Sequence, residues 1–123
     1  MAEPMIEKHS LSYDNLFAGS QAKIVTDKVT LKAGRAYLRG SILALITAEN
    51  KAVLVDSTKT DGSQVPFAVL ADDVDATLSD KTAAVYLTGE FNDSKLTFGG
   101  TDTLAKHKTE LRRIGIFTRK TSK

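Results

Sequence analysis

Short apolar runs separated by turn residues are the dominant pattern along the chain. Two of these runs are continuously apolar, Ile42–Ile46 and Phe67–Ala71. A run of that length bounded by turn residues is typical of a strand that is buried on both faces. The run Ala52–Val55 lies between them and follows a turn at Asn50–Lys51. The pattern therefore predicts a meander of three strands around which the rest of the chain packs.

Glycine and proline mark the turns that connect these strands. Asp61 and Gly62 form a strong turn signal, because glycine tolerates a positive φ and the aspartate carboxylate can cap the turn. Gly34 is expected at a second position with positive φ. Gly40 predicts a bulge or a close approach of two backbones. Pro66 cannot donate a backbone hydrogen bond, so it is expected at the start or edge of the following strand.

Further strands are predicted on both sides of the meander. They are rich in β-branched or alternating apolar residues and end at Gly, Asn or Asp. Their ranges are Ile24–Leu31, Ala83–Phe91 with a turn at Asn92–Ser94, a short return strand Lys95–Phe98, and Ile114–Thr118. In the meander itself the side chains expected to be buried include Leu43, Leu45, Val69 and Leu70.

One helix is expected near the C-terminus. Asp102 is its expected N-cap, and Leu104 and Leu111, with His107 or Lys108 between them, mark one face at helical spacing. The second half of the helix is basic, which complements the dipole at that end. The expected fold class is therefore mainly β, with six or seven short strands and one short C-terminal helix.

The chain divides into an arm, a body and a tail. Residues 1–23 show no usable periodicity, although they carry scattered apolar side chains. Such a segment cannot bury enough apolar surface on itself to offset the entropy lost on ordering. We therefore expect a flexible N-terminal arm that becomes ordered against a partner. Residues 24–118 are expected to form the β-rich domain, and residues 119–123 a basic tail.

Composition and charge narrow the class of protein. At 123 residues, 41% hydrophobic and 26% charged, the chain is expected to be one globular domain. No apolar run approaches the ~18–20 residues of a membrane span, and no secretory signal pattern begins the chain. The lack of cysteine excludes disulfides, thiolate metal sites and a cysteine nucleophile. The segment Lys106–Lys123 carries net +6 against −4 for the remainder, which indicates a solvated tail or a polyanionic partner.

Few residues suggest catalytic or metal-binding chemistry. His9 and His107 lack a spaced serine or carboxylate partner and are expected at the surface. The acids Asp72, Asp73 and Asp75 could bind a hard cation or serve an enzyme as paired carboxylates. They follow a strand directly, however, and are interpreted as solvated loop acids. The sequence thus predicts no catalytic residue, no metal site and no cofactor.

A small nucleic-acid-binding β-barrel is the alternative function. Sheets of that class present aromatic side chains for base stacking among basic residues. Here the strand aromatics have few neighbouring cations, and the basic residues gather on the helix and tail instead. The aromatics are Tyr37, Tyr86, Phe91 and Phe98 in strands, with Phe67 and Phe117 expected in the core. Direct nucleic-acid binding is therefore not expected.

An ordered set of short motifs runs from about Tyr13 to Phe117. The pieces are Tyr13–Gly19, Val29–Gly34, Leu38–Leu43, Asp61–Ser63 with Ala68–Val74 after it, Gly89–Asn92, and Leu111–Ile116 at the end of the helix. Each piece alone is unspecific, whereas the ordered set is specific. In this order the chain resembles the head decoration proteins, or capsid cement proteins, of lambda-like tailed bacteriophages.

This resemblance implies a small β-barrel or β-tulip-like domain and a viral structural role. It implies a homotrimer on the outer surface of the expanded capsid, at three-fold and quasi-three-fold positions. There it would cement neighbouring subunits of the major capsid protein and stabilise the head against internal DNA pressure. Such a virion protein is made in the host cytoplasm and needs no catalysis and no membrane. The basic tail departs from the family pattern, and no role is transferred to it.

The arm is the candidate means of binding the capsid. An arm without its own core, yet rich in leucine and aromatic residues, suits a segment that adds a strand to a partner's sheet edge. The candidate capsid-binding residues are Leu11, Tyr13, Leu16 and Phe17.

Overall fold

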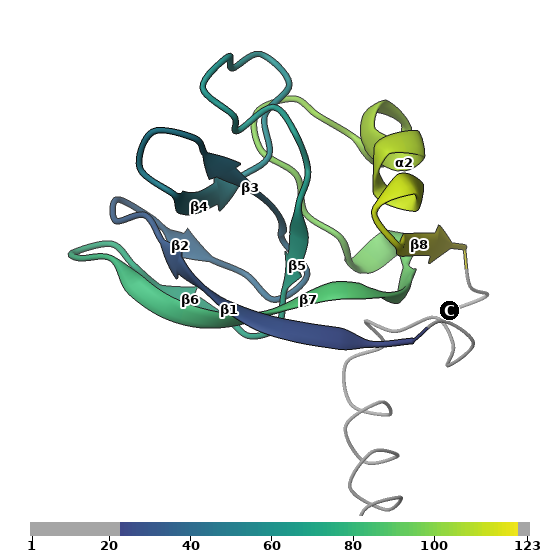
Figure 1. Cartoon of the computed structure of the whole chain (residues 1–123), viewed down its shortest axis with the longest axis horizontal. Helices are drawn as coiled ribbons and strands as arrows, with labels where there is room; N and C mark the ends of the chain where they lie inside the picture. Colours follow the sequence, from purple (N-terminus) through teal and green to yellow (C-terminus); the bar gives the residue numbers. More distant parts are fainter. Residues whose placement is uncertain (1–22, 121–123) are drawn as a thin grey trace, which may run out of the picture.

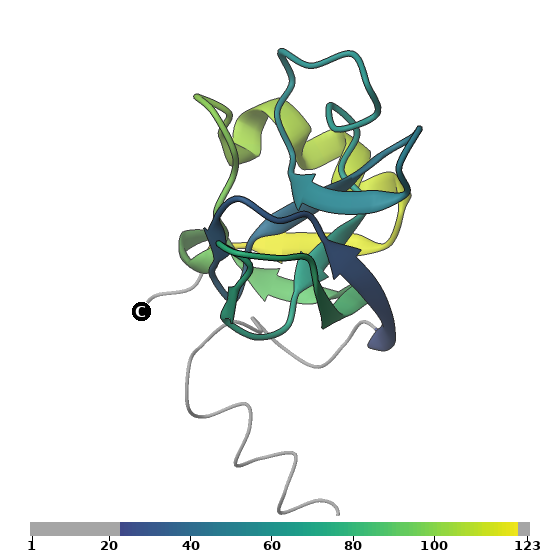
Figure 2. The ribbon, with the colours of Figure 1, turned by 90° about the vertical axis from the view of Figure 1, so that its left-hand side faces the viewer.

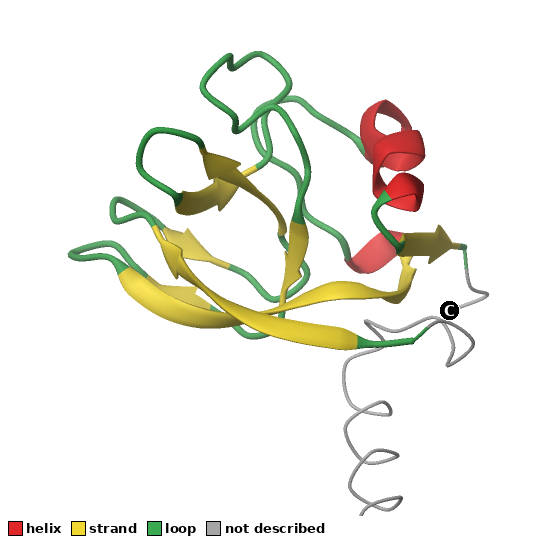
Figure 3. Ribbon diagram, in the orientation of Figure 1, coloured by secondary structure: helices red, strands yellow, loops and turns green. Residues whose placement is uncertain are grey.

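The computed structural model describes residues 23–120, which form short β-strands and one α-helix (Figures 1 and 3). The strands are β1 (Val25–Leu31), β2 (Ala36–Tyr37), β3 (Ile42–Ile46), β4 (Lys51–Leu54), β5 (Ala68–Leu70), β6 (Val74–Asp75), β7 (Lys81–Asn92) and β8 (Ile116–Arg119). The helices are the 3₁₀ turn η1 (Asp93–Lys95) and α2 (Leu104–Arg113). The predicted mainly-β class with one helix near the C-terminus is confirmed. The candidate arm residues Leu11, Tyr13, Leu16 and Phe17 lie outside the described residues.

Five strands form a ring of backbone hydrogen bonds. Their order is β1-β4-β3-β5-β7, and β7 pairs back onto β1. The antiparallel β1–β7 pairing runs along the whole of β1. The parallel contact between β1 and β4 is a single pair, Leu31 with Ala52. The ring is therefore barrel-like, with a weak junction between β1 and β4.

The remaining elements extend this ring. β8 pairs in parallel with the end of β7, and β2 and β6 form a separate two-stranded sheet. Figures 1 and 2 show α2 beside β8, on the side of the molecule away from β1. The molecule therefore has one side covered by the helix and another on which β1 is exposed to solvent.

The predicted meander is wrong in its strand order. β3 lies between β4 and β5 and pairs antiparallel with both of them. Leu43, for example, faces Leu54 on one side and Ala68 on the other. The long loop after β4 carries the chain across to the far edge of β3. It is held there by Thr47 N–H, which donates to Asp61 O at 2.9 Å.

Alternate residues of β3 pack into two different apolar clusters. Leu43 belongs to the cluster inside the ring, whereas Ile42 and Ala44 belong to a cluster against α2 and β8. Because side chains alternate across a strand, this division shows why the run is continuously apolar. Leu43, Val69 and Leu70 are fully buried, as expected. Leu45 is only partly buried, because it lies where the ring opens beside β1.

Two glycines allow close backbone approaches. Gly40 has φ +91°, donates to Leu70 O and accepts from Thr97 N–H, which confirms the predicted close approach. Gly62 has φ +108°, and a Cβ there would lie 2.5 Å from Leu45 O. A side chain at Gly62 would therefore clash with backbone as well as strain the turn. The predicted positive φ of Gly34 is also confirmed.

The segment between β7 and α2 differs from the prediction. Instead of a return strand, the 3₁₀ turn η1 follows β7, with the Asn92 side chain accepting from Ser94 N–H. Within the predicted strand, Thr97 makes one isolated parallel bridge, to Ser41. The helix begins at Leu104 with Thr103 as N-cap, so the expected capping by Asp102 is wrong. The carboxylate of Asp102 is bound by distant side chains instead, as described below.

Candidate functional site

The chain enters the described body beside an exposed apolar surface. Thr88 Oγ1 donates to the carbonyl of Lys23 at 2.6 Å and so holds the root of the arm against β7. Ile24 follows directly and is 42% exposed. Val65, 51% exposed, and Ile114, 40% exposed, line one groove together with Thr88. We call Ile24, Val65, Thr88 and Ile114 the arm-root surface.

The groove beside the arm root has a volume of about 470 Å³, within the range of pockets that bind ligands. Its walls are mainly apolar and come from β3, the loop before β5, β7 and the end of α2. The lining residues are Leu45, Thr47, Gly62, Val65, Pro66, Phe67, Leu87, Thr88 and Ile114.

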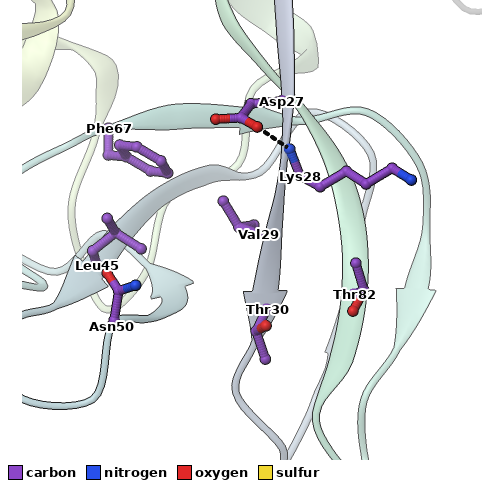
Figure 4. Close-up of a pocket in the computed structure, with 8 residues that line it drawn as sticks. All are labelled: Asp27, Lys28, Val29, Thr30, Leu45, Asn50, Phe67 and Thr82. Carbon is purple, nitrogen blue, oxygen red and sulfur yellow. Dashed lines mark hydrogen bonds between the residues drawn. The ribbon is translucent and has the colours of Figure 1, made fainter.

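A second hollow of about 400 Å³ lies beside this groove, along β1. Figure 4 shows Val29, Leu45 and Phe67 facing one another across it, while the Lys28 side chain points away. Leu45 and Phe67 line both hollows, so the two are adjacent. We call these two adjacent hollows together the seam, because they follow the weak junction of β1 with the rest of the ring.

The outer side of α2 and β8 is basic. Lys108, Arg112 and Arg119 line a shallow depression together with Phe117. Phe117 is 42% exposed, so its expected place in the core is wrong. β8 is the last strand of the sheet, and its alternation buries Ile116 while Phe117 faces outward. Arg119 is paired at 3.4 Å with Glu90.

A buried polar cluster joins α2 to the loop after β4. His107 is 1% exposed, so the expectation of a surface histidine is wrong. Its Nε2 lies 2.6 Å from Asp102 Oδ2 and its Nδ1 lies 2.8 Å from Glu110 Oε1. Asp102 also accepts from Ser57 N–H and from Ser57 Oγ–H, each at 2.7 Å. The ring of Phe98 stacks on His107 with 5.9 Å between centroids.

The electrostatics of the cluster follow from these contacts. Burial alone would raise the pKa of the Asp102 carboxyl, but hydrogen bonds from His107 and Ser57 outweigh burial and hold that pKa below its usual range. An ionised carboxylate only accepts hydrogen bonds. Both nitrogens of His107 lie within hydrogen-bond distance of carboxylate oxygens.

The cluster contains a serine, a histidine and an aspartate, the three residue types of a hydrolase catalytic triad. In a triad the serine donates to a histidine nitrogen, and the carboxylate lies on the other nitrogen. Here Ser57 donates to Asp102, and both nitrogens of His107 are occupied by carboxylates. The cluster therefore lacks the nucleophile–base contact and acts as a clamp between α2 and the loop. One sequence signal indicated the burial of His107: its helical spacing from Leu111 places both residues on the same face of α2.

The acidic residues after β5 are exposed, as expected. Asp72, Asp73 and Asp75 all face solvent. Asp73 accepts from Arg39 N–H at 2.7 Å, and Asp75 caps its own turn through Thr77. Within residues 23–120 no group of three or more acidic, histidine or cysteine residues is arranged to hold a metal ion. In the same part of the chain no helix is long and apolar enough to cross a membrane.

The aromatic side chains form no platform for stacking bases in the described body. Tyr37 and Phe91 are buried, and Phe67, Tyr86 and Phe98 are partly buried. Phe117 is the exposed aromatic among residues 23–120. The candidate binding surfaces of the described body are thus the arm-root surface, the seam and the basic outer side of α2.

Comparison with known proteins identifies the family. Residues 5–116 match the family model of the bacteriophage lambda head decoration protein D. No curated protein matches the chain. The matched range includes the four candidate arm residues and every element from β1 to the start of β8. The match confirms the resemblance seen in the ordered motifs. The chain therefore belongs to the head decoration protein family of bacteriophage lambda protein D.

Proposed function

We propose that this protein binds the outer surface of the expanded phage head as a homotrimer at three-fold and quasi-three-fold positions. There it cements neighbouring subunits of the major capsid protein and stabilises the head against the pressure of internal DNA. Membership of the head decoration family supports this role in capsid decoration. Synthesis in the host cytoplasm precedes this assembly.

The arm supplies most of the binding energy in this proposal. Leu11, Tyr13, Leu16 and Phe17 lie within the family match, and the chain leaves the body at an exposed apolar surface. Ordering a segment on a partner costs on the order of 2–5 kcal/mol, which backbone pairing and apolar anchoring must exceed. Strand addition to a capsid sheet edge supplies both. Three arms in one trimer bind multivalently, so modest affinity per arm gives strong retention.

The single observation that carries the proposal is the family match over residues 5–116. It agrees with the described body, where the one cluster resembling a catalytic triad has its serine bonded to the carboxylate instead of the histidine.

Imaging of decorated capsids tests the proposal. Expanded capsids mixed with the protein and imaged at subnanometre resolution are expected to show three-lobed density at three-fold and quasi-three-fold positions. Isolated single subunits, or density elsewhere on the capsid surface, would contradict it. The double variant Leu16→Ala with Phe17→Ala is expected to lower occupancy strongly. Leu78→Ala is the matched control, because Leu78 is an exposed leucine of the body, 95% exposed, outside the arm.

The alternative of direct nucleic-acid binding is tested on the same samples. The described body offers the basic side of α2 and β8 with Phe117 as its exposed aromatic. We expect no gel shift of single- or double-stranded DNA at the protein concentration that saturates capsids. A shift that is lost in Arg112→Ser with Arg119→Ser would favour the nucleic-acid function.

A further inference from the structure

The strand β1 has one paired edge and one open edge. Its pairing with β7 extends along all seven residues, whereas β4 meets it only at Leu31. Along the second edge, residues 25–30 have no strand partner within residues 23–120. The exposure of β1 agrees with this, because Leu31 is its only buried residue. The ring is therefore open between β1 and β4 for most of the length of β1.

One hydrogen bond shows which backbone groups lie at the open edge. Lys32 N–H donates to Ala52 O, so the N–H of residue 32 points toward β4. Backbone groups alternate in direction along a strand, and therefore the N–H groups of Thr26, Lys28 and Thr30 point the same way. An unpaired strand edge of this kind is a template for an added strand.

The seam beside this edge is apolar and contains one acidic side chain. Val29, Leu45 and Phe67 face one another across it. Figure 4 shows the Asp27 carboxylate on the same side of β1 as Val29, whereas the Lys28 side chain points away. Among residues 23–120 this carboxylate accepts from the Lys28 N–H at 2.8 Å and forms no ion pair. The seam thus carries a negative charge without a neighbouring cation.

The charge of Asp27 limits which strand can pair with this edge. An apolar strand laid over the seam would bury the carboxylate without a partner, which is unfavourable. A strand with a lysine or arginine opposite Asp27 supplies the missing counter-ion and avoids that cost. The edge is therefore suited to an extended segment that turns apolar side chains and one basic side chain toward the seam.

Two observations favour the capsid over a second copy of this chain as the source of that segment. Pairing of β1 with β1 of a second copy is two-fold, unlike the expected trimer, and would bring two Asp27 carboxylates to one contact. The seam also includes the groove beside the arm root, where Thr88 holds Lys23. The arm that we propose to bind the capsid therefore leaves the body next to the open edge.

We propose that the open edge of β1 and the seam bind an extended segment of the major capsid protein as an added strand. The backbone of that segment pairs with Thr26 and Thr30, and its apolar side chains cover Leu45 and Phe67. Its lysine or arginine forms an ion pair with Asp27. This inference rests on the proposed capsid binding, and it adds a contact in the folded body to the contact made by the arm.

Charge reversal at Asp27 tests the ion pair. In cosedimentation with expanded capsids, Asp27→Lys is expected to weaken binding at least about tenfold, because two like charges then meet in the contact. Asp72→Lys is the matched control, since it makes the same charge change at an exposed acid after β5 and is expected to alter binding less than about twofold. Circular dichroism checks that both variants are folded.

Amide hydrogen exchange tests the strand pairing in the wild-type protein. The amides of Thr26 and Thr30 are expected to exchange at least about tenfold more slowly in protein bound to expanded capsids than in free protein. The amides of Asp27 and Val29 face β7 and serve as the internal control, because they should be equally protected in both samples.

Four outcomes would overturn the inference. Fast exchange of Thr26 and Thr30 in protein that pellets with capsids would show an unoccupied edge and leave capsid binding by the arm intact. Slow exchange already in the free protein would assign the edge to the chain itself, or to a second copy if the protection is lost on dilution. Equal binding by Asp27→Lys and Asp72→Lys would exclude the ion pair. Wild-type protein that does not pellet at all would contradict the proposed function, and this inference with it.

Discussion

The side of the ring covered by α2 and the side formed by β1 differ in how fully their groups are paired. On the covered side, β3 and β5 are hydrogen-bonded along both edges, and their side chains fill two apolar clusters. Even the polar groups of His107 and Asp102 are buried with partners. On the β1 side, one strand edge is open and apolar side chains face a seam.

This difference indicates which groups stabilise the fold and which are available to bind a partner. The groups on the covered side are already buried and hydrogen-bonded in the folded chain, so they contribute to its stability and have no free interaction for a partner. Groups along the seam and at the arm-root surface keep unused hydrogen-bonding capacity and exposed apolar area, which a partner can use. The comparison therefore predicts that substitutions on the covered side change stability strongly, whereas those on the open side change it little.

The largest expected effect is loss of the buried cluster. His107→Leu leaves the buried Asp102 carboxylate with Ser57 as its remaining partner, and the loss of a hydrogen bond to a buried charged group costs about 3 kcal/mol or more. Urea denaturation measures the free energy of unfolding. Asp27→Ala on the open side is the control, with an expected change within about 0.5 kcal/mol. A loss below about 1 kcal/mol for His107→Leu would show that the cluster does not hold α2 to the loop in a way that stabilises the fold.

The next prediction compares the stability lost when a core leucine and a leucine at the seam are each truncated to alanine. Leu70→Ala removes a fully buried side chain and is expected to cost about 2–5 kcal/mol. Leu45→Ala removes a partly buried side chain at the seam and is expected to cost about 1–2 kcal/mol. Both variants are measured by urea denaturation under the same conditions. Equal losses would mean that the seam is packed as tightly as the core.

Acid is expected to weaken the covered side. The pKa of Asp102 is lower in the folded protein than in the unfolded chain, so its contribution to stability is complete above its unfolded pKa. That contribution is lost as the pH falls through the folded pKa, which lies below the usual value of about 4. Unfolding free energies between pH 6 and pH 3 should fall less steeply for Asp102→Asn than for wild type. Parallel slopes would show that Asp102 is not the responsible group.

The smallest effect is expected at the exposed acids. Asp72→Asn and Asp73→Asn should change the free energy of unfolding by less than about 0.5 kcal/mol, because both side chains face solvent. Capsid binding should be unchanged as well, with or without a chelator. Loss of binding in EDTA that calcium restores would instead indicate a metal-dependent contact.

Local signals predicted most strands because each depends on nearby residues. The continuous run Ile42–Ile46 gave a strand buried on both faces, and the turn at Asp61–Gly62 has the expected positive φ. The order of β3, β4 and β5 depends on which edge the long loop reaches, and no local pattern encodes that choice. The two-residue strands β2 and β6 are too short for any periodicity to reveal them.

The errors near the C-terminus both concern the buried polar cluster. Asp102 looked like a helix cap, but its carboxylate is bound by Ser57, 45 residues earlier in the chain. His107 was predicted at the surface, but it is buried with carboxylate partners at positions 102 and 110. A tertiary contact decided the first case, whereas the hydrogen-bond partners of His107 lie within five residues of it. The arm residues remain a prediction, since they lie outside the described residues.

Cosedimentation of an arm-deleted protein with expanded capsids tests the central claim most directly. Deletion of residues 2–20 is expected to leave a folded, soluble body, checked by circular dichroism, that no longer pellets with capsids. Neutralising Arg119, Lys120 and Lys123 in the full-length protein should weaken binding far less than the deletion. A salt series run on both proteins separates apolar anchoring from charge attraction. Full-strength binding by the deleted protein would contradict the account and assign capsid binding to the folded body, and a steep salt dependence would assign it to the basic tail.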